Sequence, residues 1–155
     1  MLSRLISLFN SLAVALQPLA ALLTRLVIGW TFVGTGRGKL VHFEKTAQYF
    51  ASLHIPMPTA NAAFIGALEL VGGACLMIGL GTRIFAALLS CTMVVAIMTG
   101  DRESFAAAFT DPEKGLMDVV PIQFLLPLLW LVAFGAGAIS VDRWLANRKA
   151  AGANK

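Results

Sequence analysis

Charged residues are scarce in this sequence of 155 residues: Asp, Glu, Lys and Arg together make up 13%, against about a quarter in a typical soluble domain. Hydrophobic residues make up 58%, and the mean hydropathy is +0.80. Residues 119–141 form a stretch of 23 without any charge, and roughly 18 or more apolar residues in a row are typical of a membrane-spanning helix. The composition therefore excludes a water-soluble core and predicts an integral membrane protein.

Cysteine and histidine are rare too, with two of each. Cys75 and Cys91 lie within apolar stretches, which excludes the disulfide framework of a small secreted domain. Core packing is the more common role for such residues, and a copper or redox site is the alternative. His42 and His54 are too far apart to share one helix face, and no metal site is predicted.

Basic residues exceed acidic ones by 12 to 8, which gives a net charge of +4. They stand singly at the ends of apolar stretches, apart from a small cluster at the C-terminal end of the chain. This distribution is typical of the topology signals of a membrane protein. We therefore predict the lipid bilayer as a partner and no nucleic acid.

The apolar pattern divides the chain into three parts. Residues 1–17 alternate apolar and polar side chains at helical spacing, which predicts an amphipathic helix in the membrane interface, with a signal peptide as the alternative. Residues 18–141 hold four predicted spans, and residues 142–155 form a basic tail. Pro18 is the expected break before the first span. The expected fold is all-α, an integral membrane four-helix bundle with an interfacial N-terminal helix.

The four predicted spans cover residues 18–36, 59–80, 84–100 and 119–141. An even number of spans places both chain ends on one side, where six basic residues would face five on the other side. The two long connections also carry compensating acidic residues. Both observations favour cytoplasmic N and C termini.

Arg25 and Glu69 are ionisable residues inside predicted spans. A charge at bilayer depth costs at least about 2.5–3.5 kcal/mol, so it must be paired or line a cavity. For two antiparallel spans, the predicted boundaries put these residues at depths that differ by roughly 4–5 Å, within reach of an Arg side chain. The sequence therefore predicts a buried ion pair. This pair either only fixes the helix register or lines a cavity for a quinone or another small polar ligand.

Residues 34–39, with the sequence Gly-Thr-Gly-Arg-Gly-Lys, close the first predicted span. Neither the dinucleotide-binding spacing nor the Walker spacing is met, and no strand precedes them, so a phosphate loop is excluded. We expect a flexible exit from the span, which places Arg37 and Lys39 at head-group level, at the mouth of any ligand site. A tight turn between the second and third spans is predicted at Thr82 and Arg83.

With these residues placed, the sequence resembles the DoxX family of small four-span membrane proteins, over about residues 25–138. The resemblance rests on the order and spacing of several short motifs. These are Arg25 followed by Gly29 and Phe32, Gly36-x-x-Lys39-Leu40, Leu53-x-Ile55-Pro56, Ala67-Leu68-Glu69-Leu70-Val71-Gly72-Gly73 and Gly79-Leu80-Gly81-Thr82-Arg83.

The resemblance implies a membrane accessory subunit of a redox system in a bacterial inner membrane, since the family's founding association is a thiosulfate:quinone oxidoreductase. It implies other membrane protein subunits as partners, no intrinsic cofactor, and a quinone as the candidate bound molecule. Carried over by position, the polar residues of interest are Arg25, Lys39, Glu69 and Arg83.

This chain also departs from the family pattern. Many relatives have His where Thr35 stands, and another His near residues 99–101. The absence of these histidines favours an accessory or structural role, so the chain is not expected to be an enzyme on its own. The alternative is a non-enzymatic structural or assembly subunit that packs against the helices of a larger membrane complex.

Overall fold

The computed structural model describes residues 2–153, which form helices joined by short connections and contain no strand. Met1, which belongs to the predicted N-terminal helix, and Asn154 and Lys155, which belong to the predicted basic tail, lie outside the described residues. The helices are α1 (Leu2–Val41), α2 (Phe43–Ser52), α3 (Pro58–Ile78), α4 (Thr82–Met98), α5 (Arg102–Thr110), the short 3₁₀ helix η1 (Leu116–Asp118), α6 (Val120–Phe134) and α7 (Val141–Ala153).

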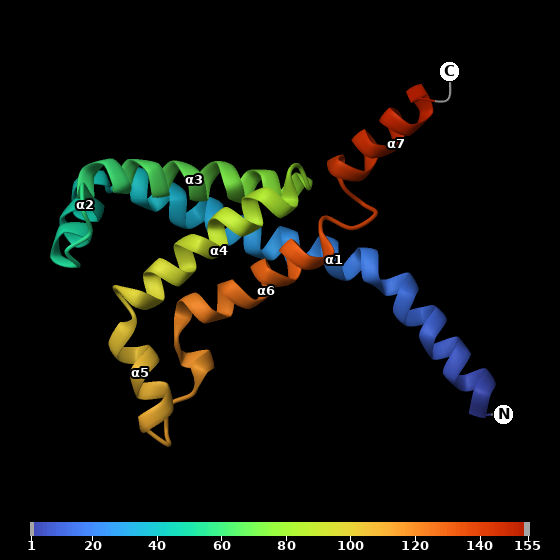
Figure 1. Cartoon of the computed structure of the whole chain (residues 1–155), viewed down its shortest axis with the longest axis horizontal. Coiled ribbons are helices and arrows are strands. Elements are labelled where there is room, and N and C mark those ends of the chain that lie inside the picture. The colour runs from blue at the N-terminus through green and yellow to red at the C-terminus, as the bar shows by residue number, and fades with distance from the viewer. Residues whose placement is uncertain (1, 154–155) are drawn as a thin grey trace.

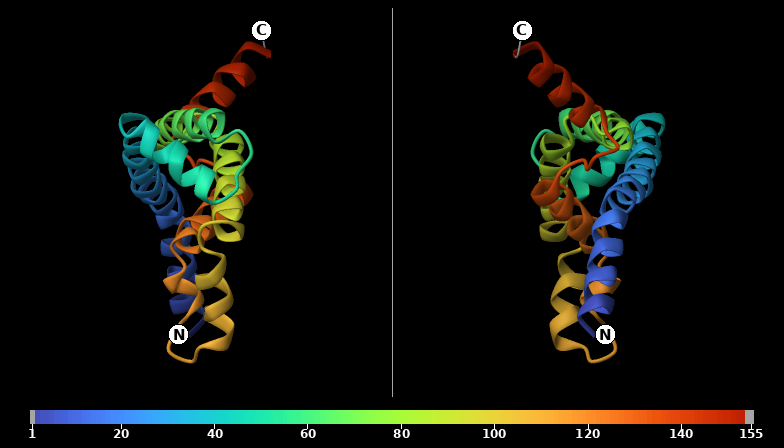
Figure 2. Two further views of the ribbon diagram at one scale, coloured as in Figure 1. Left: turned by 90° about the vertical axis from the view of Figure 1, so that its left-hand side faces the viewer. Right: turned by 90° about the vertical axis from the view of Figure 1, so that its right-hand side faces the viewer.

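Two helix pairs make up most of the fold. α1 packs along α3, and α4 packs along α6, whereas α3 and α4 diverge from the turn that joins them (Figure 1). α2 and α5 lie at one end of the molecule, and α7 and the N-terminal part of α1 extend from the other end (Figure 1). In the end-on views, α2 lies across the end of the space between α1 and α4 (Figure 2).

The hydrophobic core is shared by α1, α3, α4 and α6. Its buried members are Ile28, Phe32, Leu76, Ala86, Leu89, Met93, Leu128 and Leu131. Most large apolar side chains outside this core are exposed in the isolated chain. That distribution is typical of a protein whose outer surface meets lipid rather than water.

Glycines bring α1 and α3 into backbone contact. A Cβ added to Gly36 would lie 2.8 Å from the carbonyl oxygen of Gly66, and one added to Gly73 would lie 2.6 Å from the carbonyl oxygen of Gly29. Only glycine fits at such distances, so these residues set how closely the two helices approach. Gly34, on the same helix, has nothing within 4 Å of its added Cβ.

Two expectations about the first span are wrong. The helix does not break at Pro18, because α1 continues through it, and residues 1–17 are therefore not a separate helix within the described range. Residues 34–39 are also helical rather than a flexible exit, since α1 ends only at Val41. None of the three glycines ends the helix; Gly36 serves the close approach to α3, whereas a Cβ added to Gly34 or Gly38 would meet nothing within 4 Å. The interfacial position of the N-terminal residues stays a prediction.

Two of the described helices, α1 and α3, are long and apolar enough to cross a membrane, and the count reaches three if the bent pair of α4 and α5 forms one span. That pair is bent by 72° at the break between its helices. α6 is apolar but has only 15 residues. The all-helical, membrane-type architecture thus agrees with the sequence, while the four-span count stays a prediction.

Candidate functional site

A buried ion pair joins α1 to α3 near the end of the molecule that carries α2. The ammonium of Lys39 donates a hydrogen bond to Oε2 of Glu69, with an N–O distance of 2.6 Å. The Glu69 side chain is 3% exposed and that of Lys39 28%. A carboxylate this deeply buried is stable in its charged form only with such a partner.

This ion pair is part of the walls of two cavities. The larger cavity, here called the main cavity, has a volume of about 430 Å³, and the smaller one about 160 Å³. Lys39, Glu69 and Met93 line both of them. A volume of a few hundred Å³ suits a small organic ligand.

The main cavity lies where α3 and α4 diverge, and α2 closes its end. α2 and the residues after it contribute Tyr49, Phe50, Leu53 and Ile55. α3 contributes Asn61, Phe64, Ile65, Leu68 and Glu69, and α4 with the residues after it contributes Leu88, Cys91, Thr92, Met93, Val95, Ala96, Thr99, Gly100 and Asp101. Most of these side chains are apolar, so the ion pair is a polar group in a largely apolar wall.

The predicted pair between Arg25 and Glu69 is wrong. Glu69 pairs with Lys39, whereas the guanidinium of Arg25 donates a hydrogen bond to the carbonyl oxygen of Ile139. Arg25 is 1% exposed and lines neither cavity. It is buried, as predicted, but at the other end of the helix pair.

The helix register explains this error. The contacts of Gly36 with Gly66 and of Gly29 with Gly73 place Glu69 opposite Thr35 and leave Arg25 opposite the end of α3. These two positions on α1 are ten residues apart, or about 15 Å along the helix axis. The sequence-based estimate placed the first span too far toward the N-terminus, because it ended that span at residue 36, within the glycine-rich stretch, whereas α1 continues to Val41.

Arg25 belongs to a second polar cluster, at the turn between α3 and α4. A Cβ on Gly79, whose φ is +73°, would overlap the guanidinium, so only glycine fits there. Asp142, at the start of α7, accepts hydrogen bonds from the backbone amides of Gly81 at 2.7 Å and Thr82 at 3.0 Å. Its carboxylate therefore caps the N-terminus of α4 and adds an opposite charge near Arg25.

The turn between α3 and α4 lies at residues 79–81, and Thr82 and Arg83, which were predicted for the turn, are the first residues of α4. Thr82 is fully buried, and Arg83 donates a hydrogen bond to the carbonyl oxygen of Ala133 at 3.2 Å. Neither residue lines the main cavity. This cluster joins the two helix pairs and the start of α7.

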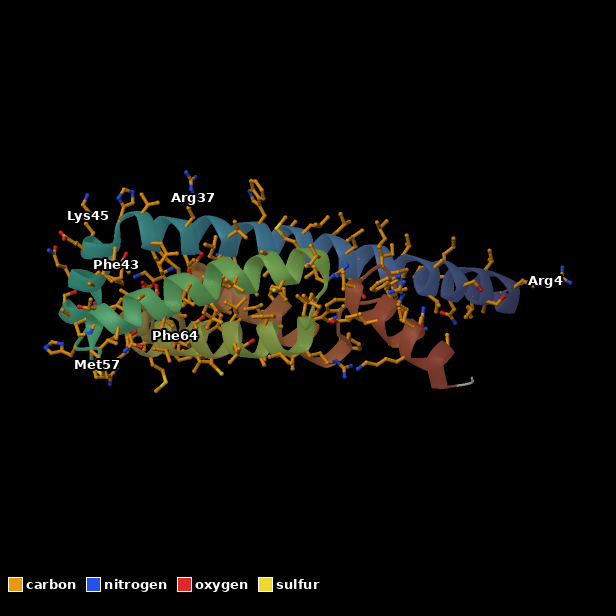
Figure 3. All side chains as sticks on the ribbon, turned by 90° about the horizontal axis from the view of Figure 1, so that it is seen from above. Arg4, Arg37, Phe43, Lys45, Met57 and Phe64 are labelled. Atoms are coloured by element: carbon orange, nitrogen blue, oxygen red, sulfur yellow. The ribbon has the colours of Figure 1, made fainter. Side chains whose placement is uncertain are left out.

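The two residues predicted for the mouth of the site separate. Lys39 is part of the wall, whereas Arg37 is exposed and points away from the bundle (Figure 3). Neighbouring residues of a helix lie about 100° apart around its axis. The side chains of Arg37 and Lys39, which are two positions apart, therefore point in directions that differ by roughly 200°. Sequence analysis did not identify Tyr49, Asn61, Asp101 or the capping role of Asp142. Their proximity depends on how α2 and α7 fold back, and no local pattern encodes that.

The apolar surface, the long helices and the buried ion pair define the class: an all-helical integral membrane protein. The DoxX family model matches residues 20–102, which is more than half of the chain. The chain belongs to the DoxX family, as its motifs indicated.

Three relatives show what the chain is similar to. It is 38% identical over 81 residues to a protein of Bacillus subtilis named "Putative oxidoreductase CatD", with 52% of this chain and 59% of that protein covered. It is 31% identical over 140 residues to an uncharacterised membrane protein of Mycobacterium tuberculosis, with 86% of each chain covered. It is 31% identical over 137 residues to an inner membrane protein of Escherichia coli, with 83% of this chain and 92% of that protein covered. No solved structure matches the chain significantly.

Proposed function

We propose that this protein is an accessory membrane subunit of a quinone-linked redox system, and that its main cavity binds the quinone. The observation that carries the proposal is the cavity of about 430 Å³ with the buried Lys39 and Glu69 pair in its wall. Drug-sized and quinone-sized molecules bind in cavities of this volume that combine apolar walls with a few polar groups.

The relatives support a redox context. One of them carries the name of an oxidoreductase, although the match covers 59% of its length. The described residues offer no group of three or more His, Cys, Asp or Glu side chains that could hold a metal ion. In this proposal, a partner protein brings the redox cofactor for electron transfer, and this chain supplies a membrane site for the quinone.

The proposal includes a topology. α1, α3, the α4 and α5 pair, and α6 form four spans, with the N-terminal residues of α1 in the interface and both termini in the cytoplasm of a bacterial cell. Figure 1 supports this arrangement, because the connections around α2 and α5 lie at one end of the molecule and α7 lies at the other. The exposed apolar surfaces of these helices suit contact with lipid and with other membrane subunits.

Purification of the tagged full-length protein from its native membrane tests the function. Co-migration of a protein that carries a flavin, haem or iron–sulfur cofactor, together with extractable quinone, is expected. Co-migration of a multisubunit complex that lacks both would contradict the proposal. That result would favour the alternative, an assembly subunit, which is supported by the glycine-mediated helix packing and the apolar outer surface.

A further inference from the structure

The polar end of the main cavity offers an open hydrogen-bond acceptor. Lys39 donates a hydrogen bond to Oε2 of Glu69, whereas Oε1 accepts no hydrogen bond from the residues that the structure describes. The Lys39 ammonium has three N–H groups, of which this bond uses one. A ligand group that can both donate to Oε1 and accept from Lys39 would satisfy both sides of the pair.

Two threonines of the wall add acceptors. The hydroxyl of Thr92 donates to the carbonyl oxygen of Leu89, and that of Thr99 donates to the carbonyl oxygen of Val95, each at 2.8 Å. Each hydroxyl has a single proton, so toward the cavity these two groups can only accept. A ligand head with a hydrogen-bond donor therefore fits beside these two threonines better than one with acceptors alone.

The fixed charges of the wall disfavour an anion. Its Asp, Glu, Lys and Arg side chains are Lys39, Glu69 and Asp101, which give one positive and two negative charges. A carboxylate in the cavity would lie near Glu69 in surroundings of low dielectric constant, where repulsion between like charges is strong. A neutral head group avoids this cost.

The apolar part of the cavity opens sideways toward the lipid. Phe64 on α3 (Figure 3) and Leu88 and Val95 on α4 line the cavity, yet they are 60%, 42% and 50% exposed. A hydrocarbon tail can therefore extend between the diverging helices while the head reaches the ion pair.

From these observations we propose that the main cavity selects neutral amphipathic molecules whose head is a hydroxyl group, and that it rejects carboxylates of the same length. This inference rests on the proposed function in one respect, because both concern the same cavity. A hydroxyl donates to Glu69 and accepts from Lys39, whereas a ketone only accepts. Two sources supply this chemistry, a quinol and a lipid alcohol.

Cys91 provides a direct probe, because it is exposed and lines the cavity, whereas Cys75 lines neither cavity. In a Cys75→Ala background, the rate of maleimide alkylation of Cys91 is measured with the full-length protein in lipid nanodiscs. The probes form two matched pairs: decanol with decanoate, and an anaerobic, fully ring-substituted decyl benzoquinol with its quinone. Protection of Cys91 reports binding without any redox partner.

We expect decanol to protect Cys91 at a concentration about tenfold lower than decanoate, and the quinol at one about tenfold lower than the quinone, since hydrogen bonds to charged groups are among the stronger ones. The more effective of the two hydroxyl compounds identifies the source. Glu69→Gln leaves Lys39 without a carboxylate, so decanoate should then protect better than decanol. Asp101→Asn, at the cavity edge, should improve protection by decanoate alone and tests the charge argument if Glu69→Gln does not fold.

If decanoate protects Cys91 as well as decanol does, or better, in the protein without cavity substitutions, the inference is overturned. The cavity would then still be a ligand site. Protection by the quinone alone would overturn the inference as well while supporting a quinone-linked function. If no probe protects Cys91, both the inference and the cavity's role in the proposed function are contradicted. Co-purified redox partners test the proposed function separately.

Discussion

At the residue scale, Glu69 carries most of the argument. It is 2% exposed, and its charge is balanced by Lys39, which reaches it from one helix away. The sequence identified Glu69 and Lys39 as residues of interest, because charges are so few in apolar surroundings. It could not identify their pairing, since that depends on a register offset of several residues between α1 and α3.

The ion pair predicts that substitutions of its two partners have coupled effects on stability. Lys39→Met leaves a buried carboxylate alone, which should destabilise the protein by an amount toward the lower end of about 3–5 kcal/mol, because Lys39 is partly exposed. The double variant Lys39→Met with Glu69→Leu should recover much of that loss. Thermal unfolding in nanodiscs compares Lys39→Met, Glu69→Leu and the double variant. Strictly additive effects would show that the two residues do not interact.

At the element scale, α1 and α3 form the closest helix contact. The sequence analysis assigned the glycines of residues 34–39 to a flexible exit from the first span. Local propensity favoured that interpretation, since glycine weakens an isolated helix by about 1 kcal/mol. Contact with α3 outweighs this local cost, and no periodicity in one segment can show it.

Gly36 and Gly34 test this contact as a matched pair on α1. Gly36→Ala should lower thermal stability by several degrees, because its Cβ would lie 2.8 Å from the carbonyl oxygen of Gly66. Gly34→Ala should be neutral or slightly stabilising, since nothing lies within 4 Å of its Cβ and alanine favours the helix. Thermal midpoints of both variants in the same lipid decide the matter. Equal effects would argue against the backbone contact.

The cap on α4 comes from α7, far along the chain. Asp142→Ala removes the acceptor for the amides of Gly81 and Thr82 and should destabilise the protein by about 0.5–2 kcal/mol. Arg143→Ala, at the exposed neighbouring residue, is the control and should have little effect. Thermal unfolding and protease sensitivity at the turn between α3 and α4 are suitable readouts. An effect of Arg143→Ala as large as that of Asp142→Ala would contradict the capping role.

At the scale of the whole molecule, composition was enough to predict an all-helical membrane protein, and motif order was enough to predict the DoxX family. Both are confirmed. The position of α2 across the main cavity was not predictable, because it depends on the angle at which a short helix folds back.

The topology prediction concerns the two ends of the molecule. In a background without Cys75 and Cys91, single cysteines at Lys45 and Glu113 should react with a membrane-impermeant maleimide from the same side of the membrane. A cysteine at Arg148 on α7 should react only from the opposite side. Labelling of intact cells and of inverted vesicles gives the two directions. Reaction of Lys45→Cys and Glu113→Cys from opposite sides would contradict the four-span arrangement.

The central claim is that the main cavity holds an amphipathic molecule, and its content can be measured directly. Ala96→Trp places a large ring in the cavity wall, whereas Val94→Trp adds the same ring at a neighbouring position of α4 that does not line it. Molecules extracted from each protein, purified from native membranes, are quantified by mass spectrometry per mole of protein. The account predicts that unmodified protein and Val94→Trp retain a bound quinol, quinone or lipid alcohol and that Ala96→Trp loses most of it. Equal content in all three proteins would contradict the claim.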